Sequence, residues 1–557
     1  MDRLKIITVF VLLLNNTIFS QSNASFEKNN ETCRLSTNAT AFVNGEQLLY
    51  AVNCLPSNSN QKLLSKIAYV ELIDHQKKST FKQKLFLNNG KGNGYFTIPM
   101  TLQTGNYKLI AYSNRMFSFN EAEIQSVAIT IINPYIVSTS EHIKTTNDPI
   151  ASISNTSTAT FIETPKEFSN RQEISFDLKS LLADLKANSF SVSVRKKDEL
   201  DHNFTKNGTS QNSLSKITTN ANLISELRGE IIAGKITAKT PSFSIENKNI
   251  SLSFPGQNNT VKITKTNKKG EFYFLLEKAF YNNNAIIQGV DEDKENYAIE
   301  LYKNDTDFSG IAISPELTIP SSLKKPIENR LVATQIENSY FEKKQDSIKK
   351  TNASLPFYAV YSKEYKLDDY TRFPTLQETI IEIIDGVSLI KHKDNYQLYL
   401  KDYDENTNLE VPSLVLVDGL YIQDIKELLN YKAEVFATIN TVKGGYFYGS
   451  KLYNGIVELT TKNYNYETKL TGDFIIRPEM LRPLPEKVNY NPKYVANSDL
   501  TKIPDYRYQL YWEPNYTDTN QPITFYTSDI DGTFEIKIEG FDSKNEYFKQ
   551  SQFFEVK

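Results

Sequence analysis

Short runs in which apolar and polar residues alternate recur along most of the chain, separated by segments rich in Gly, Asn, Ser and Pro. Clear examples are residues 66–74 (KIAYVELID), 94–99 (GYFTIP) and 106–113 (NYKLIAYS). Alternation places successive side chains on opposite faces, as in a half-buried β-strand. The 33 Tyr and 32 Phe residues, against one Trp, add side chains that strands favour. The sequence therefore predicts a mainly β protein.

One segment departs from this pattern, between residues 371 and 463. Thr375 and Glu378 have the spacing of a helix capping box, and apolar residues recur at three and four positions after them. A nearly continuous apolar strand closed by Asp-Gly follows at residues 412–419, and then a second helical pattern and a further strand. This mixture predicts one small α+β domain within the β-rich chain.

At 557 residues the chain exceeds the size at which a single hydrophobic core stops growing, so several domains are expected. Short strands joined by turn signals suggest an immunoglobulin-like sandwich for the first of them. The predicted units are residues 30–135 and 136–225, both β-sandwiches; 226–303, a third sandwich; 304–366, a polar and partly helical connector; 367–463, the α+β domain; and 464–557, a closing sandwich.

The first twenty residues differ from the rest of the chain. Arg3 and Lys5 precede a short apolar run at residues 6–14, and Ser20 is small enough for a cleavage site. The run is shorter than the ~20 apolar residues that a membrane span needs. We therefore expect residues 1–20 to be a signal peptide and the mature chain to lie outside the cytoplasm; an N-terminal anchor is the alternative.

The charge balance changes the range of expected partners. The chain has 63 basic and 66 acidic residues, a net charge of −3, and no long run of either sign. Nucleic acid is therefore not an expected partner, because its recognition relies on a clustered basic surface.

Only two cysteines are present, Cys33 and Cys54, and they flank a strand-like stretch of a chain expected to be exported. They are candidates for one disulfide closing a loop of about 20 residues, which would contribute roughly 3 kcal/mol. Two buried free thiols are the alternative.

Two of the predicted sandwiches resemble known domain families. Residues 30–135, through Asn44-Gly45-Glu46 and the strands at 69–74 and 105–112, resemble the macroglobulin-like domain of many exported Bacteroidota proteins. Residues 226–303 are similar to the carboxypeptidase regulatory-like domain, a transthyretin-type sandwich. In that pattern a Gly-ending turn leads into alternating aromatics, which places Phe272 and Phe274 on the inward face. Such domains are scaffolds.

The α+β segment resembles the plug domain of TonB-dependent outer-membrane receptors. The likeness lies in the order of a helix, the strand LVDG at residues 416–419 and the closing stretch from Gly445 to Lys462. In those receptors a 22-stranded barrel follows, which requires more than ~200 residues, whereas residues 464–557 follow here. We therefore do not expect this chain to have the transport activity of those receptors, and we expect a plug domain that is separate from its barrel.

The chemistry of an enzyme is not apparent in the sequence. No Ser lies in a nucleophile elbow, no Gly-rich loop suits a phosphate, and Gly45-Glu46-Gln47 follows Asn44 rather than the Cys of a macroglobulin thioester. The four histidines lie far apart without a second metal ligand at zinc-like spacing: His75, His142, His202 and His392. We expect no catalytic activity, no cofactor and no metal.

These expectations combine into one leading hypothesis for function. The chain is expected to be a non-catalytic exported subunit, periplasmic or associated with the outer membrane. Its plug-like domain would dock on or close a separate outer-membrane barrel, either a secretion translocon of the type 9 kind or another transport or assembly complex. The alternative is a periplasmic or surface module that binds glycan or peptide.

The densest aromatic cluster of the plug-like segment supplies the candidate docking residues. Exposed aromatics suit a protein partner, although the same residues would equally serve as core. The candidates are Tyr446, Phe447, Tyr448 and Tyr453.

Overall fold

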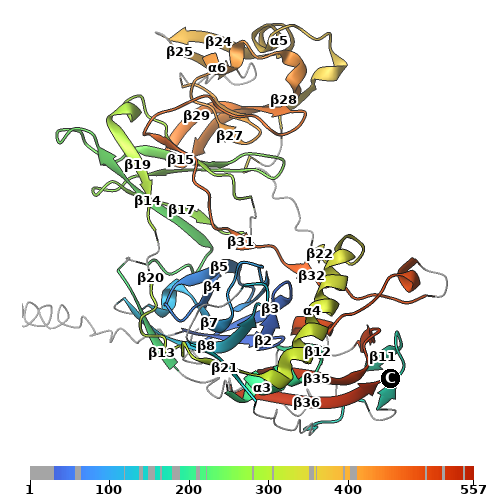
Figure 1. The fold of residues 1–557 in the computed structure, drawn as a ribbon. Helices are drawn as coiled ribbons and strands as arrows, with labels where there is room; N and C mark the ends of the chain where they lie inside the picture. The colour runs from blue at the N-terminus through green and yellow to red at the C-terminus, as the bar shows by residue number, and fades with distance from the viewer. Residues whose placement is uncertain are drawn as a thin grey trace, which may run out of the picture.

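The computed structural model of the chain consists mainly of β-strands and forms two lobes (Figure 1). Of the described residues, those between 31 and 220, 306 and 349, and 483 and 557 form the lower lobe, and those between 229 and 301 and between 357 and 476 form the upper lobe. The predicted signal peptide, residues 1–20, lies outside the described residues. The structure describes residues 31–56, 64–117, 120–136, 142–147, 157–162, 166–178, 189–207, 214–220, 223–278, 282–303, 306–349, 357–358, 361–392, 395–401, 411–495, 499–516, 521–542 and 546–557.

The first sandwich of the lower lobe contains the N-terminal strands. One sheet has the order β1-β3-β6, and the other has the order β20-β13-β8-β7-β4-β5-β31, with β2 paired to β8. Apolar side chains from both sheets, such as Val52 and Leu109, are fully buried between them. The strands are β1 (Glu31–Thr37), β2 (Ala41–Val43), β3 (Gln47–Pro56), β4 (Ile67–Ile73), β5 (Ser79–Phe86), β6 (Lys91–Thr97), β7 (Gly105–Tyr112), β8 (Glu121–Ile132), β13 (Leu214–Thr219), β20 (Thr306–Asp307) and β31 (Pro483–Leu484).

The second sandwich of the lower lobe is assembled from two distant parts of the sequence. Its sheets have the orders β10-β36-β35-β12-β33 and β11-β34. The strands are β10 (Glu167–Phe168), β11 (Glu173–Phe176), β12 (Ser189–Lys196), β33 (Gln509–Tyr516), β34 (Ile523–Tyr526), β35 (Gly532–Phe541) and β36 (Tyr547–Val556).

Residues 136–225 and 464–557 are therefore not two separate sandwiches as the sequence predicted. β12 lies between β33 and β35, and its Val192 and Val194 pack with Ile536 in one core. Neither part supplies enough strands to cover this core alone. Two other elements of residues 136–225 pack on the rest of the lower lobe. β9 (Ile143–Thr146) pairs with β21 (Leu317–Pro320), and α3 (Glu199–Asn207) contacts β2.

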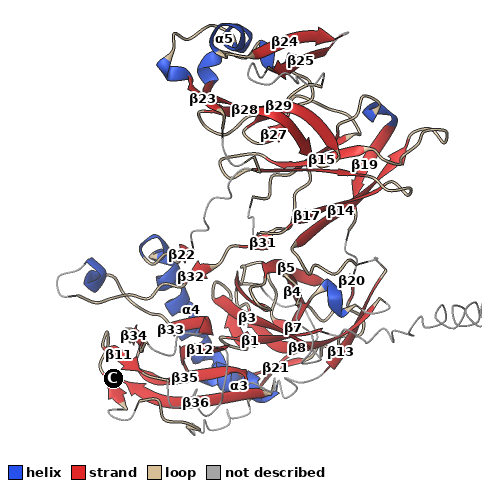
Figure 2. Cartoon of the chain, turned by 180° about the vertical axis from the view of Figure 1, so that it is seen from behind, coloured by secondary structure: helices blue, strands red, loops and turns tan. Residues whose placement is uncertain are grey.

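The predicted connector, residues 304–366, is divided between the lobes: residues 306–349 are an integral part of the lower lobe, whereas β23 (Lys363–Lys366) near its end joins the sheet of the upper lobe. A short turn, η3 (Ser321–Leu323), leads into α4 (Lys324–Ser339), which lies against the first sandwich (Figure 2). Helix α4 buries Arg330 and Ala333 rather than a continuous apolar stripe. After it, β22 (Ser347–Ile348) pairs with β32 (Lys487–Val488).

The third sandwich belongs to the upper lobe and has sheets of order β17-β14-β19 and β16-β15-β18-β30. Phe272 and Phe274 are buried inside it, so the predicted inward orientation is confirmed. Its strands are β14 (Glu230–Ala238), β15 (Asn249–Phe254), β16 (Thr260–Lys265), β17 (Glu271–Leu276), β18 (Ile286–Gly289), β19 (Tyr297–Leu301) and β30 (Ile475–Ile476).

The predicted α+β domain forms the far end of the upper lobe (Figure 1), and we use the name plug-like domain for it only as a label taken from the predicted resemblance. Its sheet has the order β23-β28-β29-β26-β27, with a separate β24–β25 hairpin. The predicted capping box is confirmed: Glu378 N donates to Thr375 Oγ1 at 3.3 Å, and Thr375 N donates to Glu378 Oε2 at 3.1 Å. The elements are β23 (Lys363–Lys366), α5 (Leu376–Ile383), β24 (Val387–His392), β25 (Asn395–Leu400), β26 (Leu414–Val417), β27 (Leu420–Tyr421), α6 (Lys426–Leu429), β28 (Phe436–Tyr448) and β29 (Lys451–Thr461).

After the plug-like domain the chain runs back through both lobes. On the way β30 adds to a sheet of the third sandwich, β31 adds to a sheet of the first sandwich, and β32 pairs with β22. No helix among the described residues has the length and apolar character of a membrane span. Short 3₁₀ turns complete the fold: η1 (Asn114–Met116), η2 (Lys294–Asn296), η4 (Phe341–Lys343), η5 (Leu367–Asp369), η6 (Ala433–Val435) and η7 (Asp499–Lys502).

Candidate functional site

The Asp-Gly turn after β26 organises the plug-like domain. Asp418 and Gly419 have positive φ angles of 49° and 80°, which favour Gly and Asp in tight turns. The buried Asp418 carboxylate accepts hydrogen bonds from Thr461 N at 2.8 Å, Thr461 Oγ1 at 2.6 Å and Tyr466 N at 3.0 Å. Asp418 therefore fixes the end of β26 to the end of β29 and has a structural role.

The same turn also attaches the plug-like domain to the third sandwich. Gly256 N donates to Asp418 O at 2.9 Å, and Gln288 Nε2 donates to Tyr421 O at 2.8 Å. A single hydrophobic core extends from the third sandwich into the plug-like domain and includes Phe274 and Leu459. The inner face of the plug-like domain is therefore already occupied by its neighbour within the chain.

The four predicted docking aromatics all lie on the β28–β29 hairpin but differ in their exposure to solvent. Tyr446 pairs directly with Tyr453 across the hairpin, but Tyr453 is only 2% exposed and belongs to the core. Alternation along β28 turns Phe447, which is 76% exposed, away from its two neighbours.

Tyr446 and Tyr448 are half-buried against Phe357, a residue that the sequence did not single out. The rings of Tyr448 and Phe357 stack with centroids 3.7 Å apart, and the Tyr448 hydroxyl donates to Val261 O in the third sandwich. Burial raises the pKa of Tyr448, so its hydroxyl stays protonated as a donor. Of the four candidates only Phe447 is mainly exposed to solvent.

Other exposed apolar side chains lie toward the far end of the plug-like domain. Ile381 on α5 is 57% exposed, Ile390 on β24 is 46% exposed and Tyr370 is 41% exposed. We call these three the distal apolar residues. Figure 1 shows α5 and β24 at the end of the molecule opposite the lower lobe.

The two lobes meet at a cluster of buried charges. Lys84 Nζ of β5 donates to Glu230 Oε1, at the start of β14, at 2.8 Å. Arg482, in the segment that follows the plug-like domain, places its Nη1 2.5 Å from Glu230 Oε2. Glu226 accepts from the Tyr69 hydroxyl at 3.0 Å. Burial raises the pKa of Glu226 to about 7, despite the opposing effect of Lys84. This cluster links the third sandwich to the first.

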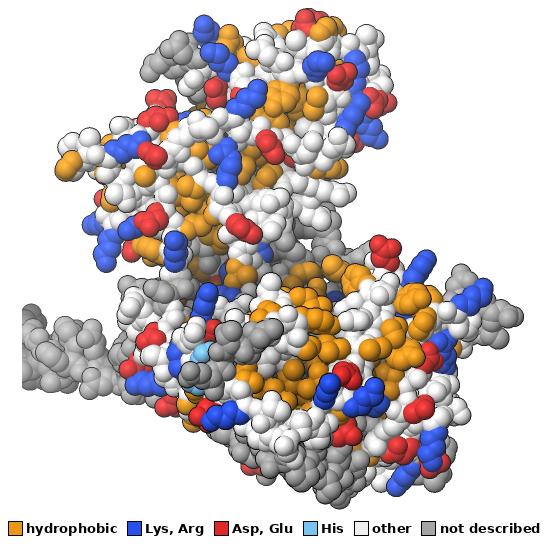
Figure 3. All heavy atoms as spheres, in the orientation of Figure 1, with side chains coloured by type: hydrophobic (Ala, Val, Ile, Leu, Met, Phe, Trp, Pro, Cys, Tyr) orange, Lys and Arg blue, Asp and Glu red, His pale blue; other side chains and the backbone are white. Residues whose placement is uncertain are grey.

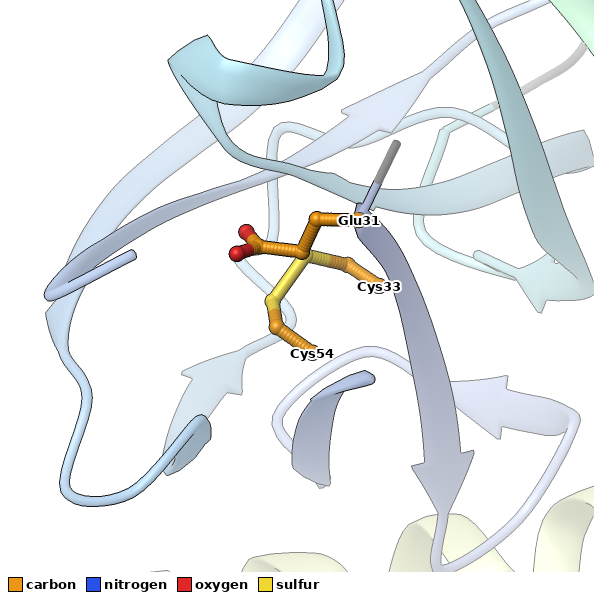
Figure 4. A group of neighbouring side chains, drawn as sticks. All are labelled: Glu31, Cys33 and Cys54. Carbon is orange, nitrogen blue, oxygen red and sulfur yellow. A yellow bond between two sulfur atoms is a disulfide. The ribbon is translucent and has the colours of Figure 1, made fainter. Parts of the chain in front are cut away.

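Cys33 and Cys54 are direct cross-strand partners on β1 and β3 and form a disulfide, with both side chains buried (Figure 4). The Glu31 carboxylate lies beside the two sulfur atoms. It accepts hydrogen bonds from Ser113 Oγ at 2.6 Å and Ser65 N at 2.9 Å. Because both sulfurs are in the disulfide, this group offers no thiolate to a metal ion.

No family model matches the sequence, and no curated protein matches it. Solved structures align only loosely. An Escherichia coli alpha-2-macroglobulin activated by porcine elastase is 8% identical, with 95% of this chain and 44% of that chain covered, at a TM-score of 0.22. A Salmonella alpha-2-macroglobulin is 9% identical, with 96% and 40% covered, at a TM-score of 0.22.

A third alignment is with dimeric latent PorU from Porphyromonas gingivalis. It is 8% identical, with 50% of this chain and 34% of that chain covered, at a TM-score of 0.17. The chain thus spans less than half the length of each of these three proteins. At TM-scores this low, the neighbours define neither the fold nor the function of this chain.

Proposed function

We propose that this chain is a non-catalytic exported subunit whose plug-like domain docks on a separate outer-membrane barrel. The barrel belongs to a secretion translocon of the type 9 kind or to another transport or assembly complex. The observation that carries the proposal is the exposure of the distal apolar residues Tyr370, Ile381 and Ile390 at the end of the molecule.

The two faces of the plug-like domain support this assignment. Its inner face is fixed to the third sandwich by the Asp418 turn and a shared core. Its outer part leaves large apolar side chains in water, although α5 buries Leu376 and Ile380 on its other face. An apolar surface at a projecting end would suit a protein partner. The two lower sandwiches then act as a base that holds this end away from the rest of the chain.

The proposal is tested by affinity purification of the tagged full-length chain from detergent-solubilised outer membranes. A barrel protein is expected to co-purify in stoichiometric amount with the unaltered chain. The double variant Ile381→Asp/Ile390→Asp is expected to lose it, because two charges would have to be desolvated at the interface. Deleting residues 371–463 is less informative, since it would uncover the core shared with the third sandwich.

A matched control is Val332→Asp on α4, which is 54% exposed and lies in the lower lobe. It is expected to retain the barrel. Thermal unfolding of all variants establishes that each is folded. If no barrel protein accompanies the unaltered chain, or if the folded double variant retains it fully, the docking proposal is wrong.

A further inference from the structure

The lower lobe contains a pocket of about 200 Å³ that is separate from the plug-like domain. Its lining residues come from the first sandwich, from α4, from the chain next to β22 and β32, and from the edge strand β33. Figure 1 labels α4, β22 and β32 side by side in the lower lobe. Pockets of ~300–1,000 Å³ hold drug-sized ligands, so this one has room for a smaller ring-sized group. Its aromatic lining consists of Phe341, Tyr490, Tyr506, Tyr508, Tyr511 and Trp512.

Neutral polar side chains also line the pocket. Asn38, Gln47, Asn338 and Asn489 line the pocket together with Gln509. The Gln509 side-chain nitrogen donates to Ser193 Oγ at 2.9 Å and to Tyr511 O at 2.7 Å. Its side-chain oxygen is buried and accepts no hydrogen bond from any described residue. A ligand hydroxyl in the pocket would satisfy this oxygen, since buried polar atoms are nearly always hydrogen-bonded.

The charged groups of the pocket are already paired within the protein. Arg507 donates to Asp505 at 2.7 and 2.8 Å, and this pairing raises the pKa of the Arg507 side chain against the effect of burial. Lys344 lies 2.6 Å from Glu337. A charged ligand would have to compete with these pairs, so the pocket favours an uncharged one.

An extended peptide is a poor fit because the free edge of β33 is already capped. Peptides that add to a sheet need unpaired backbone carbonyls at its edge. Here Arg507 Nη1 donates to Leu510 O at 3.1 Å, and Asn489 Nδ2 donates to Trp512 O at 3.1 Å.

We propose that this pocket binds one unit of a neutral oligosaccharide. The C–H face of a pyranose ring carries partial positive charge and packs on the negative face of an aromatic ring. Its hydroxyls both donate and accept, which suits amide side chains and tyrosine hydroxyls. Figure 3 shows apolar side chains gathered on the face of the lower lobe that is turned to the viewer. The inference does not depend on barrel docking, because the pocket contains no residue of the plug-like domain.

Trp512 provides a direct measurement, because it is the only Trp in the sequence and lines the pocket. The full mature chain is titrated with hexamers of glucose, mannose, xylose and N-acetylglucosamine, and separately with an unstructured peptide. At least one hexamer is expected to produce a saturable change in Trp fluorescence. The proposal is overturned if none does, or if the peptide alone binds.

Two single variants locate the binding. Tyr506→Ala and Gln509→Leu are each expected to weaken the affinity about tenfold or more, which corresponds to about 1.4 kcal/mol. Tyr273→Ala is the matched control, since this Tyr is partly exposed on the third sandwich outside the pocket. Melting curves show which variants are folded, and one folded pocket variant is sufficient. Unchanged affinity in a folded pocket variant would place the binding elsewhere and contradict the assignment.

Discussion

The guanidinium of Arg330 lies 2.9 Å from Glu46 Oε2, although 284 residues separate the two in the sequence. Arg330 is fully buried, and its guanidinium also lies 3.3 Å from Asp201 and 3.5 Å from Asp198. Tyr508 of the second sandwich covers it, with the ring centroid 5.6 Å away. One side chain of α4 thus joins the first sandwich, the segment around α3 and the second sandwich.

Replacing Arg330 by Met should strongly destabilise the lower lobe. The substitution removes the central cation of three buried carboxylates and leaves Arg195, 3.4 Å from Glu46 and 3.8 Å from Asp201, to offset their charge. Breaking a buried ion pair typically costs about 3–5 kcal/mol, so a loss of roughly that size is expected. Urea unfolding measures the change. Arg228→Met is the control, because Arg228 is 74% exposed in its ion pair with Glu277 and should change stability by less than about 1 kcal/mol. Equal effects of the two variants would contradict the role of Arg330.

The Glu226 carboxyl should make stability depend on pH near neutrality. Its folded-state pKa is raised from 4.5 to about 7, so the folded chain holds more protons than the unfolded chain within this window. The free energy of unfolding should therefore fall as the pH rises from about 4.5 to 7 and level off above it. Burial also raises the pKa of Asp198 to about 6, which acts in the same direction.

Urea midpoints between pH 5 and pH 8 test this dependence on Glu226. The urea midpoint of Glu226→Gln should fall less with rising pH than that of the unaltered chain, because the neutral amide does not titrate. Glu467→Gln, a change at an exposed position, should leave the decline unaltered. Parallel curves for all three proteins would mean that other groups cause the dependence.

Reduction of the Cys33–Cys54 disulfide should lower the stability of the first sandwich. The bridge joins residues 21 positions apart on paired strands, and closing a loop of this size contributes roughly 3 kcal/mol. Unfolding with and without dithiothreitol measures the loss. A Cys33→Ala/Cys54→Ala variant should be less stable from the start and insensitive to the reductant. If the reductant has no effect on the unaltered chain, the prediction is wrong.

Two glycines of the plug-like domain should respond differently to the same substitution. Gly419 and Gly444 both have positive φ, of 80° and 94°, so Ala costs about 1 kcal/mol at either position. A Cβ at Gly444 would meet nothing within 4 Å, whereas at Gly419 it would collide with Asn259 of the third sandwich.

Gly419→Ala should therefore cost about 1–3 kcal/mol more than Gly444→Ala and should increase proteolysis between the plug-like domain and the third sandwich. Urea unfolding and limited trypsin digestion measure the two effects. Indistinguishable variants would show that the Asp418 turn is not closely packed on its neighbour.

Local signals of the sequence were reliable where neighbouring residues determine the structure. The capping box of Thr375 and Glu378 and the inward Phe272 and Phe274 follow from spacing alone. The partners of β12 could not be predicted, since strand alternation does not encode which distant strand completes a sheet. Arg330 was also missed, because a charged residue on a helix is normally assigned to the surface and its carboxylate partners come from distant segments.

The strands that pair with β12, namely β33 and β35, are synthesised long after it, and this order affects how the chain can fold. Ser191 of β12 hydrogen-bonds to Glu539 O of β35, 348 residues later. During synthesis from the N-terminus, the first sandwich and most of the upper lobe emerge while β12 still has both edges open. Open edges pair readily with other chains. We therefore expect a product truncated before residue 509, which lacks β33 and β35, to leave both edges of this strand open and to aggregate.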